Sequence, residues 1–294
     1  MRWLIIVALC VAGCGGSPTS PSPTPRPVPA PTPTPAPAPA PPPTFTGTVT
    51  DTVSGAPVAG YTAVLVGSRV TISAPGYLTR ETQNGPRVDL IRDAAPFSLA
   101  FYRQFVRNEA DAPSTMQPLR RLTQAPSIYL QATGLTPATI AALEHAARTA
   151  VYEFSGRTIG AVTFESGLDL RADRAGWIIV EQTTQDPYPG DGKTACGRAW
   201  VGASLGHVWL ITARPDCRAA LAWTLLHEMG HAMGFYHVTA PRAVMVPGRP
   251  LADMTITAAE QYHSAIAYRR APGNQDVDRD SVTAGFSAPR LMVD

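Results

Sequence analysis

The sequence has no hydrophobic run long enough to cross a lipid bilayer as a helix. Its most apolar stretch is residues 3–12, well short of the roughly 20 residues that a spanning helix needs. Arg2 precedes this stretch, which gives the charged start and short apolar core of an export signal. We therefore expect residues 1–13 to be a signal peptide and not a membrane-spanning helix.

An excess of charge of either sign is also missing. The chain has 24 Lys and Arg against 22 Asp and Glu, a formal net charge of +2, and this balance predicts no nucleic-acid partner. Asp276, Asp278 and Asp280 alternate near the end of the sequence, but a full EF-hand calcium loop is absent. We expect these carboxylates to be solvated charges in a loose polar tail, residues 271–294.

Cysteine is scarce, with four in 294 residues. Cys10 lies within the signal peptide. Cys14 ends the sequence VAGC, which resembles a bacterial lipobox, and the resemblance implies cleavage before Cys14 and lipidation of its side chain. The alternative is an ordinary signal peptide with an unmodified cysteine. Cys196 and Cys217 remain, and because an exported chain meets an oxidising environment we expect them to form a disulfide.

Residues 14–43 are predicted to be a linker. From residue 17 onward it is almost entirely Pro, Ala, Thr and Ser. Proline at nearly every second position removes backbone donors and fixes φ, so neither helix nor sheet is expected. A polyproline II chain that rises about 3.1 Å per residue would reach roughly 80 Å. Such a spacer suits a folded part that a lipid on Cys14 tethers to the membrane of the cell envelope, outside the cytoplasm.

Residues 44–93 have the character of β-strands. Gly and Pro turns separate four β-rich runs, at 45–50, 61–66, 69–73 and 88–91. FTGTVTD at 45–51, GAPVAG at 55–60 and APGY at 74–77 resemble the carboxypeptidase regulatory-like β-sandwich. The resemblance implies a small, non-catalytic all-β module on the N-terminal side, which we interpret as a spacer or docking module.

Residues 126–270 alternate between strand and helix patterns. Thr136 and Pro137 predict the start of one helix, and Thr257 with Glu260 predicts a capping box for another that ends near residue 270. Asp216 is a candidate N-cap for a helix between them. Strands are expected at 127–131, 159–165, 177–181, 200–204 and 207–212. This order predicts an α/β (α+β) domain in which helices pack on a twisted, mostly parallel sheet.

Residues 94–125 are predicted to connect the two folded parts. The aromatic-rich stretch 97–107 indicates a helix with an aromatic face. One interpretation of the connector is a helical linker. The other is a pro-segment that covers the functional site.

The strongest signal is HEMGHAMGFYH at residues 227–237. His227 and His231 are four apart, which places both imidazoles on one face of a helix. Gly234 can take the positive φ that ends a helix and turns the chain, so that His237 meets the other two. Three neutral imidazoles around a tetrahedral Zn²⁺ leave one position for water, the arrangement of a catalytic zinc site. Glu228 is the candidate general base for that water. The alternative is an amphipathic helix end with exposed histidines.

This spacing resembles the metzincin zinc endopeptidases, which also have a methionine turn after the third histidine. AVMVP at 243–247 matches that turn, and its proline is similar to the matrixin branch. The tyrosine of the astacin and serralysin branches is absent, as is a matrixin-type cysteine switch. The resemblance also implies that an edge strand, here 199–205, binds the substrate backbone. The site residues that it implies are zinc ligands at His227, His231 and His237, a base at Glu228, and Met245 beneath the metal.

The three remaining histidines are not predicted ligands. We expect His145 to lie on the surface of its helix and His207 to be a strand residue with satisfied hydrogen bonds. For His263 we expect a surface position or a place behind the metal ligands.

The sequence therefore predicts a monomeric, zinc-dependent endopeptidase with a protein or peptide substrate, tethered to the cell envelope. One alternative is a catalytically silent or latent binding or adhesion lipoprotein that retains its metal site. The presence of Glu228 argues against it, because loss of activity usually shows first at the base. Another alternative is a zinc protein that acts on a non-peptide substrate.

Overall fold

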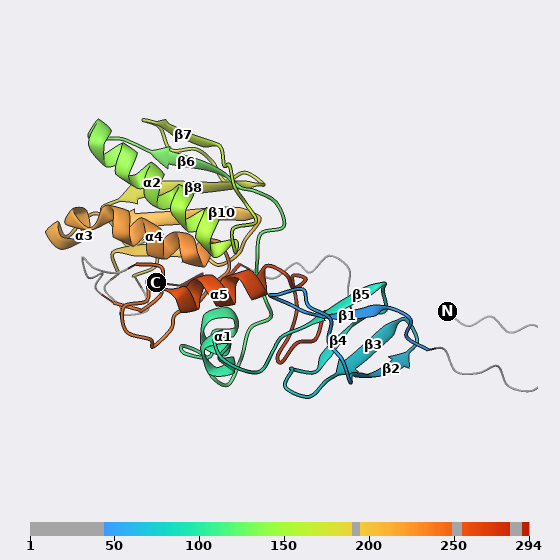
Figure 1. Ribbon diagram of the computed structural model, residues 1–294. Helices are drawn as coiled ribbons and strands as arrows, with labels where there is room; N and C mark the ends of the chain where they lie inside the picture. Colours follow the sequence, from blue (N-terminus) through green and yellow to red (C-terminus); the bar gives the residue numbers. More distant parts are fainter. Residues whose placement is uncertain (1–43, 190–194, 249–254, 283–289, 294) are drawn as a thin grey trace, which may run out of the picture. The chain divides into compact units, whose positions relative to one another are not determined.

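A six-stranded mixed sheet lies at the centre of the domain that contains the histidine motif (Figure 1). Its strands are β6 (Ser127–Gln131), β7 (Phe164–Gly167), β8 (Trp177–Thr183), β9 (Gly197–Trp200), β10 (Leu205–Ile211) and β11 (Met292–Val293). Their order in the sheet is β11-β9-β10-β8-β6-β7. The strands β7, β6, β8 and β10 are parallel, whereas β9 is antiparallel to both β10 and β11. The predicted, mostly parallel sheet is therefore a parallel core with an antiparallel edge.

This computed structural model describes residues 44–189, 195–248, 255–282 and 290–293. Residues 43–294 belong to one compact unit. The predicted signal peptide, the predicted lipidation site at Cys14 and the predicted linker lie outside the described residues. Within the described ranges, no helix is both long enough and apolar enough to cross a membrane.

Two helices, α2 (Pro137–Phe154) and α4 (Leu221–Ala232), pack together on one face of the sheet (Figure 1). The predicted start of α2 is confirmed, because Thr136 Oγ1 accepts the Thr139 N–H at 3.1 Å. The predicted capping box is also confirmed, at the start of α5 (Ala258–Ala267). The helix ends three residues before the predicted limit.

The predicted N-cap at Asp216 is wrong. Arg214 is the N-cap of a short helix, α3 (Pro215–Ala219), which precedes α4. Pro215 is already inside this helix, since proline's fixed φ suits a first turn. Asp216 therefore lies two residues past the capping position, and its Oδ1 instead accepts the Arg214 Nε–H at 3.1 Å.

The predicted strand 200–204 is shorter and earlier in the chain. It ends at Trp200, and residues 201–204 form a turn in which Gly202 takes a φ of 52°. The Gly202 N–H donates to the His231 carbonyl at 3.0 Å. A backbone that turns toward α4 in this way cannot continue along the sheet.

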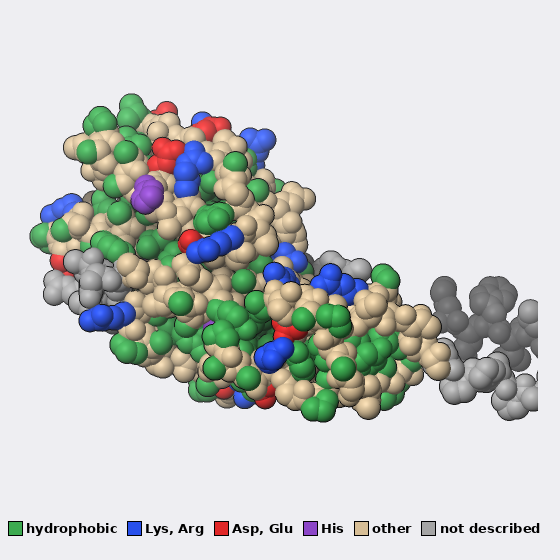
Figure 2. Space-filling model, in the orientation of Figure 1, with side chains coloured by type: hydrophobic (Ala, Val, Ile, Leu, Met, Phe, Trp, Pro, Cys, Tyr) green, Lys and Arg blue, Asp and Glu red, His purple; other side chains and the backbone are tan. Residues whose placement is uncertain are grey.

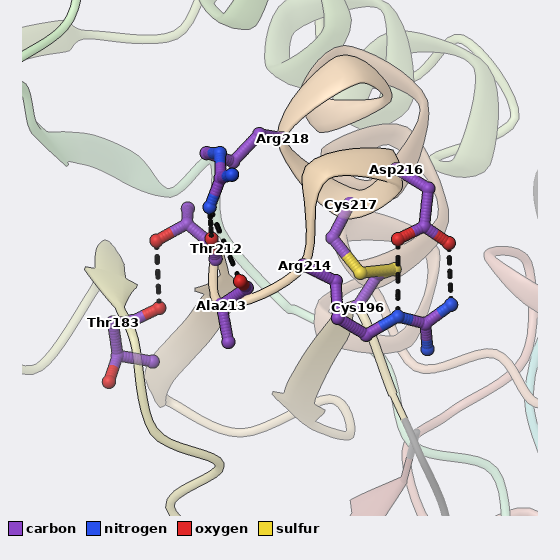
Figure 3. The surroundings of a disulfide bond; sticks show 8 residues. All are labelled: Thr183, Cys196, Thr212, Ala213, Arg214, Asp216, Cys217 and Arg218. Atoms are coloured by element: carbon purple, nitrogen blue, oxygen red, sulfur yellow. Dashed lines mark hydrogen bonds and ion pairs between the residues drawn. A yellow bond between two sulfur atoms is a disulfide. The ribbon is translucent and has the colours of Figure 1, made fainter.

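The predicted disulfide between Cys196 and Cys217 is confirmed (Figure 3). The two Cα atoms are 5.1 Å apart, within the usual range for a disulfide. Cys196 directly precedes β9 and Cys217 lies in α3. The bond therefore fixes the start of the edge strand to the helix that leads into the histidine motif.

The N-terminal β module has two small sheets. One pairs β1 (Thr48–Asp51) with β5 (Arg87–Leu90) in parallel, and the other is an antiparallel sheet of β2 (Thr62–Val66), β3 (Arg69–Ser73) and β4 (Arg80–Gln83). Of these strands, only β4 was not predicted. The module has a core of its own, formed by Val49, Val58, Val70, Ile72, Val88 and Leu90. Figure 2 shows hydrophobic side chains gathered over this antiparallel sheet, and exposed valines of β2 belong to its surface.

The connector contains the predicted helix, α1 (Leu99–Arg107), with Ser98 as its N-cap. Residues from Phe97 to Leu119 contribute to the same hydrophobic core as α2, α4 and the six-stranded sheet. The Phe105 ring stacks on Phe235, just after the motif helix, with ring centres 4.2 Å apart. The boundary at residue 126 stays a prediction, but hydrophobic packing is continuous across it.

The expectation that the tail carboxylates are solvated is wrong. Asp278 is 2% exposed and Asp280 is 8% exposed. Asp278 accepts from the buried guanidinium of Arg270 at 2.7 Å, and Asp280 accepts from Arg80 at 3.0 Å. A carboxylate can be buried when a hydrogen-bonded opposite charge offsets its lost hydration.

Arg270 and Arg80 also form ion pairs with Asp89 of β5. Burial alone would raise the pKa of Asp89, but the guanidinium groups of Arg270 and Arg80 outweigh it and lower the pKa to about 2. Arg270 follows α5, Arg80 lies in β4 and Asp280 lies in the tail. The network therefore joins the β module to the residues after α5.

Candidate metal centre

The helix α4 presents two imidazoles of the motif on one face. Leu221, Leu225 and Met229 are buried, which fixes the rotation of the helix. His227 and His231 are one turn apart, with ring centres 4.8 Å apart and Nε2 atoms 3.1 Å apart.

Gly234 turns the chain so that His237 returns to the first two histidines. Its φ is 108°, as predicted for a glycine that ends the helix. A Cβ at this position would overlap the Arg120 carbonyl of the connector. The His237 ring centre lies 5.4 Å from that of His227 and 4.8 Å from that of His231. The three side chains form a group whose ligand atoms lie within 4.8 Å of one another.

The outer nitrogen of each ring is held by an acceptor. His227 Nδ1 donates to the Val244 carbonyl at 2.6 Å, and His231 Nδ1 donates to the Phe235 carbonyl at 2.7 Å. A carbonyl oxygen can only accept, so each Nδ1 carries a proton and each neutral ring has its lone pair on Nε2. His237 Nδ1 lies 2.8 Å from Asp111 Oδ2, which fixes that ring in the same way.

The inner nitrogens fit a metal ion. Two lone pairs 3.1 Å apart repel unless a cation or a proton lies between them. Burial, together with the neighbouring His227 and His237, holds the pKa of His231 well below its usual value, which disfavours the proton. His237 Nε2 is buried without a hydrogen-bond partner among the described residues. Neutral imidazoles with a fixed tautomer are the donors that Zn²⁺ takes in three-histidine sites.

The predicted methionine turn packs directly against the motif helix. The Val238 N–H donates to the Met245 carbonyl at 2.9 Å, and the Met245 N–H donates to Glu260 Oε1 at 2.9 Å. Met245 is fully buried, and its sulfur occupies the space that a Cβ on Gly230 would need. Gly230 lies between His227 and His231 on α4, so Met245 supports the segment that carries both rings.

Glu228 lies between the motif helix and the edge strand. It is 3% exposed. A Cβ at Gly197 of β9 would come within 2.5 Å of the Glu228 Cγ and Oε1 atoms. A side chain at position 197 would therefore require the Glu228 side chain to move away from β9.

The other three histidines lie outside the metal group. His145 is exposed, as predicted. His207 is a buried residue of β10 whose ring nitrogens lie 2.7 Å from Asp173 and 3.1 Å from Glu181, so its predicted role is confirmed. A surface position for His263 is wrong: it is buried, and its ring packs against aromatic residues of the α1 region.

Asp111 is the site residue that the sequence did not predict. It is 126 positions away from His237 and belongs to no motif. It lies in an irregular stretch beyond α1, where neither spacing nor periodicity marks it.

Comparison with known proteins adds no family assignment. No protein-family model matches the sequence, and no curated protein matches it either. The chemistry of the site is therefore inferred from its own geometry.

Proposed function

We propose that the chain is a zinc-dependent endopeptidase of the metzincin type. The observation that carries the proposal is the pair of lone-pair Nε2 atoms on His227 and His231, 3.1 Å apart, with the buried Nε2 of His237 beside them. These three side chains would hold Zn²⁺. The spacing of the motif and the packing of Met245 against Gly230 support the same assignment.

The chain's own residues would divide the remaining work. When bound, Zn²⁺ supplies a Lewis acid that polarises a carbonyl and lowers the pKa of a water molecule. The Glu228 carboxylate takes a proton from water on one of its oxygens and delivers it to the leaving amine. Because the Glu228 side chain lies beside Gly197 of β9, this proton transfer would take place next to the strand with which an extended peptide would pair.

The cellular setting is part of the same proposal. A lipid on Cys14 would anchor the chain to the cell envelope, and the disulfide between Cys196 and Cys217 agrees with an oxidising compartment. The protease would act as a monomer on protein or peptide substrates. The β module, which the arginine network joins to the residues after α5, would be a non-catalytic spacer or docking module.

The test is cleavage of a denatured protein by the full chain, with zinc content measured in every sample. The reaction is run with and without a chelator, beside Glu228→Gln. Glu144→Gln is the matched control, because Glu144 forms a partly exposed pair with Arg148 on α2, away from the three histidines. We expect chelator-sensitive cleavage that Glu228→Gln abolishes and Glu144→Gln retains.

Two other results would redirect the proposal. Zinc bound one to one without cleavage would favour the latent binding lipoprotein or a non-peptide substrate. Absence of bound zinc after loading would reject the metal site itself.

A further inference from the structure

The strand β9, which lies between β11 and β10, runs beside the part of α4 that carries Glu228 and His231. At one end, Gly197 lies against Glu228. Just past the other end, the Gly202 N–H donates to the His231 carbonyl at 3.0 Å. The outer edge of β9 is therefore the strand edge nearest to Glu228 and the metal ligands. Under the proposed function, an extended substrate would pair with it.

A segment of the chain itself already pairs with this edge. In β11, Met292 lies opposite Trp200 and Val293 lies opposite Ala199, in antiparallel register. The Val201 N–H donates to the Leu291 carbonyl at 2.8 Å. An added substrate strand would use these same backbone groups of β9 and Val201.

Side-chain contacts hold the same segment in place. The Arg290 guanidinium lies over the Trp200 ring, 5.5 Å from its centre. Arg290 Nη1 also lies 3.6 Å from Asp173 Oδ2. Residue numbers in β11 increase toward the Gly197 end of β9, so the segment runs toward Glu228. The segment is therefore antiparallel to β9 and points toward Glu228.

We propose that residues 290–293 act as a built-in competitor of the substrate. This inference rests on the proposed function and concerns the regulation of the same site. The pairing is short, with two residues in β11, and both are only half-buried. Such a strand pairs with β9, yet a substrate that makes more contacts displaces it.

The expected effect follows from occupancy. If a few backbone hydrogen bonds and one cation–π contact keep residues 290–293 paired with β9 about nine-tenths of the time, the apparent KM rises about tenfold. Removal of the competitor should therefore lower KM about tenfold and leave kcat nearly unchanged. Competition also predicts that a peptide with the sequence of residues 290–293 inhibits a chain that lacks them.

The experiment compares the full chain with three variants on one fluorogenic peptide. The first lacks residues 290–294. The second is Val293→Pro, which removes a backbone N–H and disfavours the strand. The third is Val293→Ala, which keeps the N–H and serves as the matched control. Zinc content and thermal unfolding are measured for each, so the point variant remains informative if the truncated chain is unstable.

A second readout does not depend on activity. The Val201 amide is held by the Leu291 carbonyl, so its hydrogen exchange should accelerate in the truncated chain and in Val293→Pro. Val293→Ala should leave it unchanged. The acetylated and amidated peptide Arg-Leu-Met-Val, added to the truncated chain, should restore protection and inhibit competitively.

The outcomes separate the two proposals. A lower KM in the truncated and proline variants, together with competitive inhibition by the peptide, supports the competitor. Cleavage with the same KM in all four chains overturns the competitor and leaves the protease intact. Absence of cleavage by every zinc-loaded chain, the truncated one included, overturns the proposed function and the competitor with it.

Discussion

The contact between Met245 and Gly230 predicts that Gly230→Ala destabilises the fold when Met245 is present and stabilises it when Met245 is replaced by alanine. Gly230 is a helical residue between the two histidines of α4, and a Cβ on it would overlap the Met245 sulfur. The same Cβ would lie 3.1 Å from Met245 Cε and 3.1 Å from Phe154 Cε2. Gly230→Ala therefore forces either the helix or the methionine to move.

The magnitudes follow from packing and helix propensity. An added methyl group in a full core costs about 1–3 kcal/mol, whereas alanine in place of a helical glycine gains about 1 kcal/mol. We therefore expect Gly230→Ala to lower the free energy of unfolding by about 1 kcal/mol. Met245→Ala should lower it by about 2–5 kcal/mol, because the methionine is fully buried. In the Met245→Ala background, Gly230→Ala should instead stabilise by about 1 kcal/mol, since the new methyl fills part of the cavity.

The assay is urea unfolding of the four proteins in excess chelator, because bound metal would add stability by mass action. Met116→Ala is the control, since Met116 is 38% exposed and its loss should cost no more than about 0.5 kcal/mol. If Gly230→Ala has the same effect with and without Met245, within about 0.5 kcal/mol, the two residues are not coupled and the reasoning is refuted.

Three further predictions concern groups around the site and the fold. Asp111→Asn should weaken zinc binding about tenfold, measured by chelator competition, whereas Asp93→Asn at an exposed position should not; equal affinities would remove Asp111 from the site. The pKa of Asp89 is about 2 in the folded protein against 3.8 for an unperturbed aspartate, so its carboxylate stabilises the fold above about pH 4 and that contribution is lost as the pH falls toward 2. Asp89→Asn should therefore lower the free energy of unfolding by about 2 kcal/mol at pH 7 and by almost nothing at pH 2; a constant difference across this range would contradict it. Replacing both Cys196 and Cys217 with serine should lower the free energy of unfolding by about 3 kcal/mol, measured as a Tm below that of the oxidised parent chain. Equal Tm values would show that the disulfide does not stabilise the fold.

The parts of the site that follow from the sequence are those whose geometry is local. A spacing of four on a helix brings His227 and His231 together, and a glycine with positive φ returns His237 to them. The capping box is also a relation between residues three apart. Such features depend on backbone geometry within a few residues, which the sequence specifies directly.

The features that the sequence did not predict depend on contacts between distant segments. Asp278 and Asp280 look like solvated tail charges until Arg80 and Arg270 are placed beside them. Arg80 and Asp280 are 200 positions apart, and no periodicity relates them. The pairing of β11 with β9 is similar, since a two-residue strand has no pattern of its own. Tertiary packing decides these positions, and local propensity does not.

The contacts of the connector favour a structural part of the domain over a pro-segment. A pro-segment that covers a site should be separable from the domain, but Phe105 stacks on Phe235 and the Tyr236 N–H donates to the Phe105 carbonyl at 2.8 Å. Gln104 Oε1 accepts the Thr239 N–H at 3.0 Å, so the segment holds both sides of His237. Asp111 then fixes that ring through its outer nitrogen, and His237 Nε2 belongs to the group of atoms that could hold a metal ion. The connector therefore supports His237 on the side away from the other two histidines, and its removal should disturb the group of three histidines instead of uncovering it.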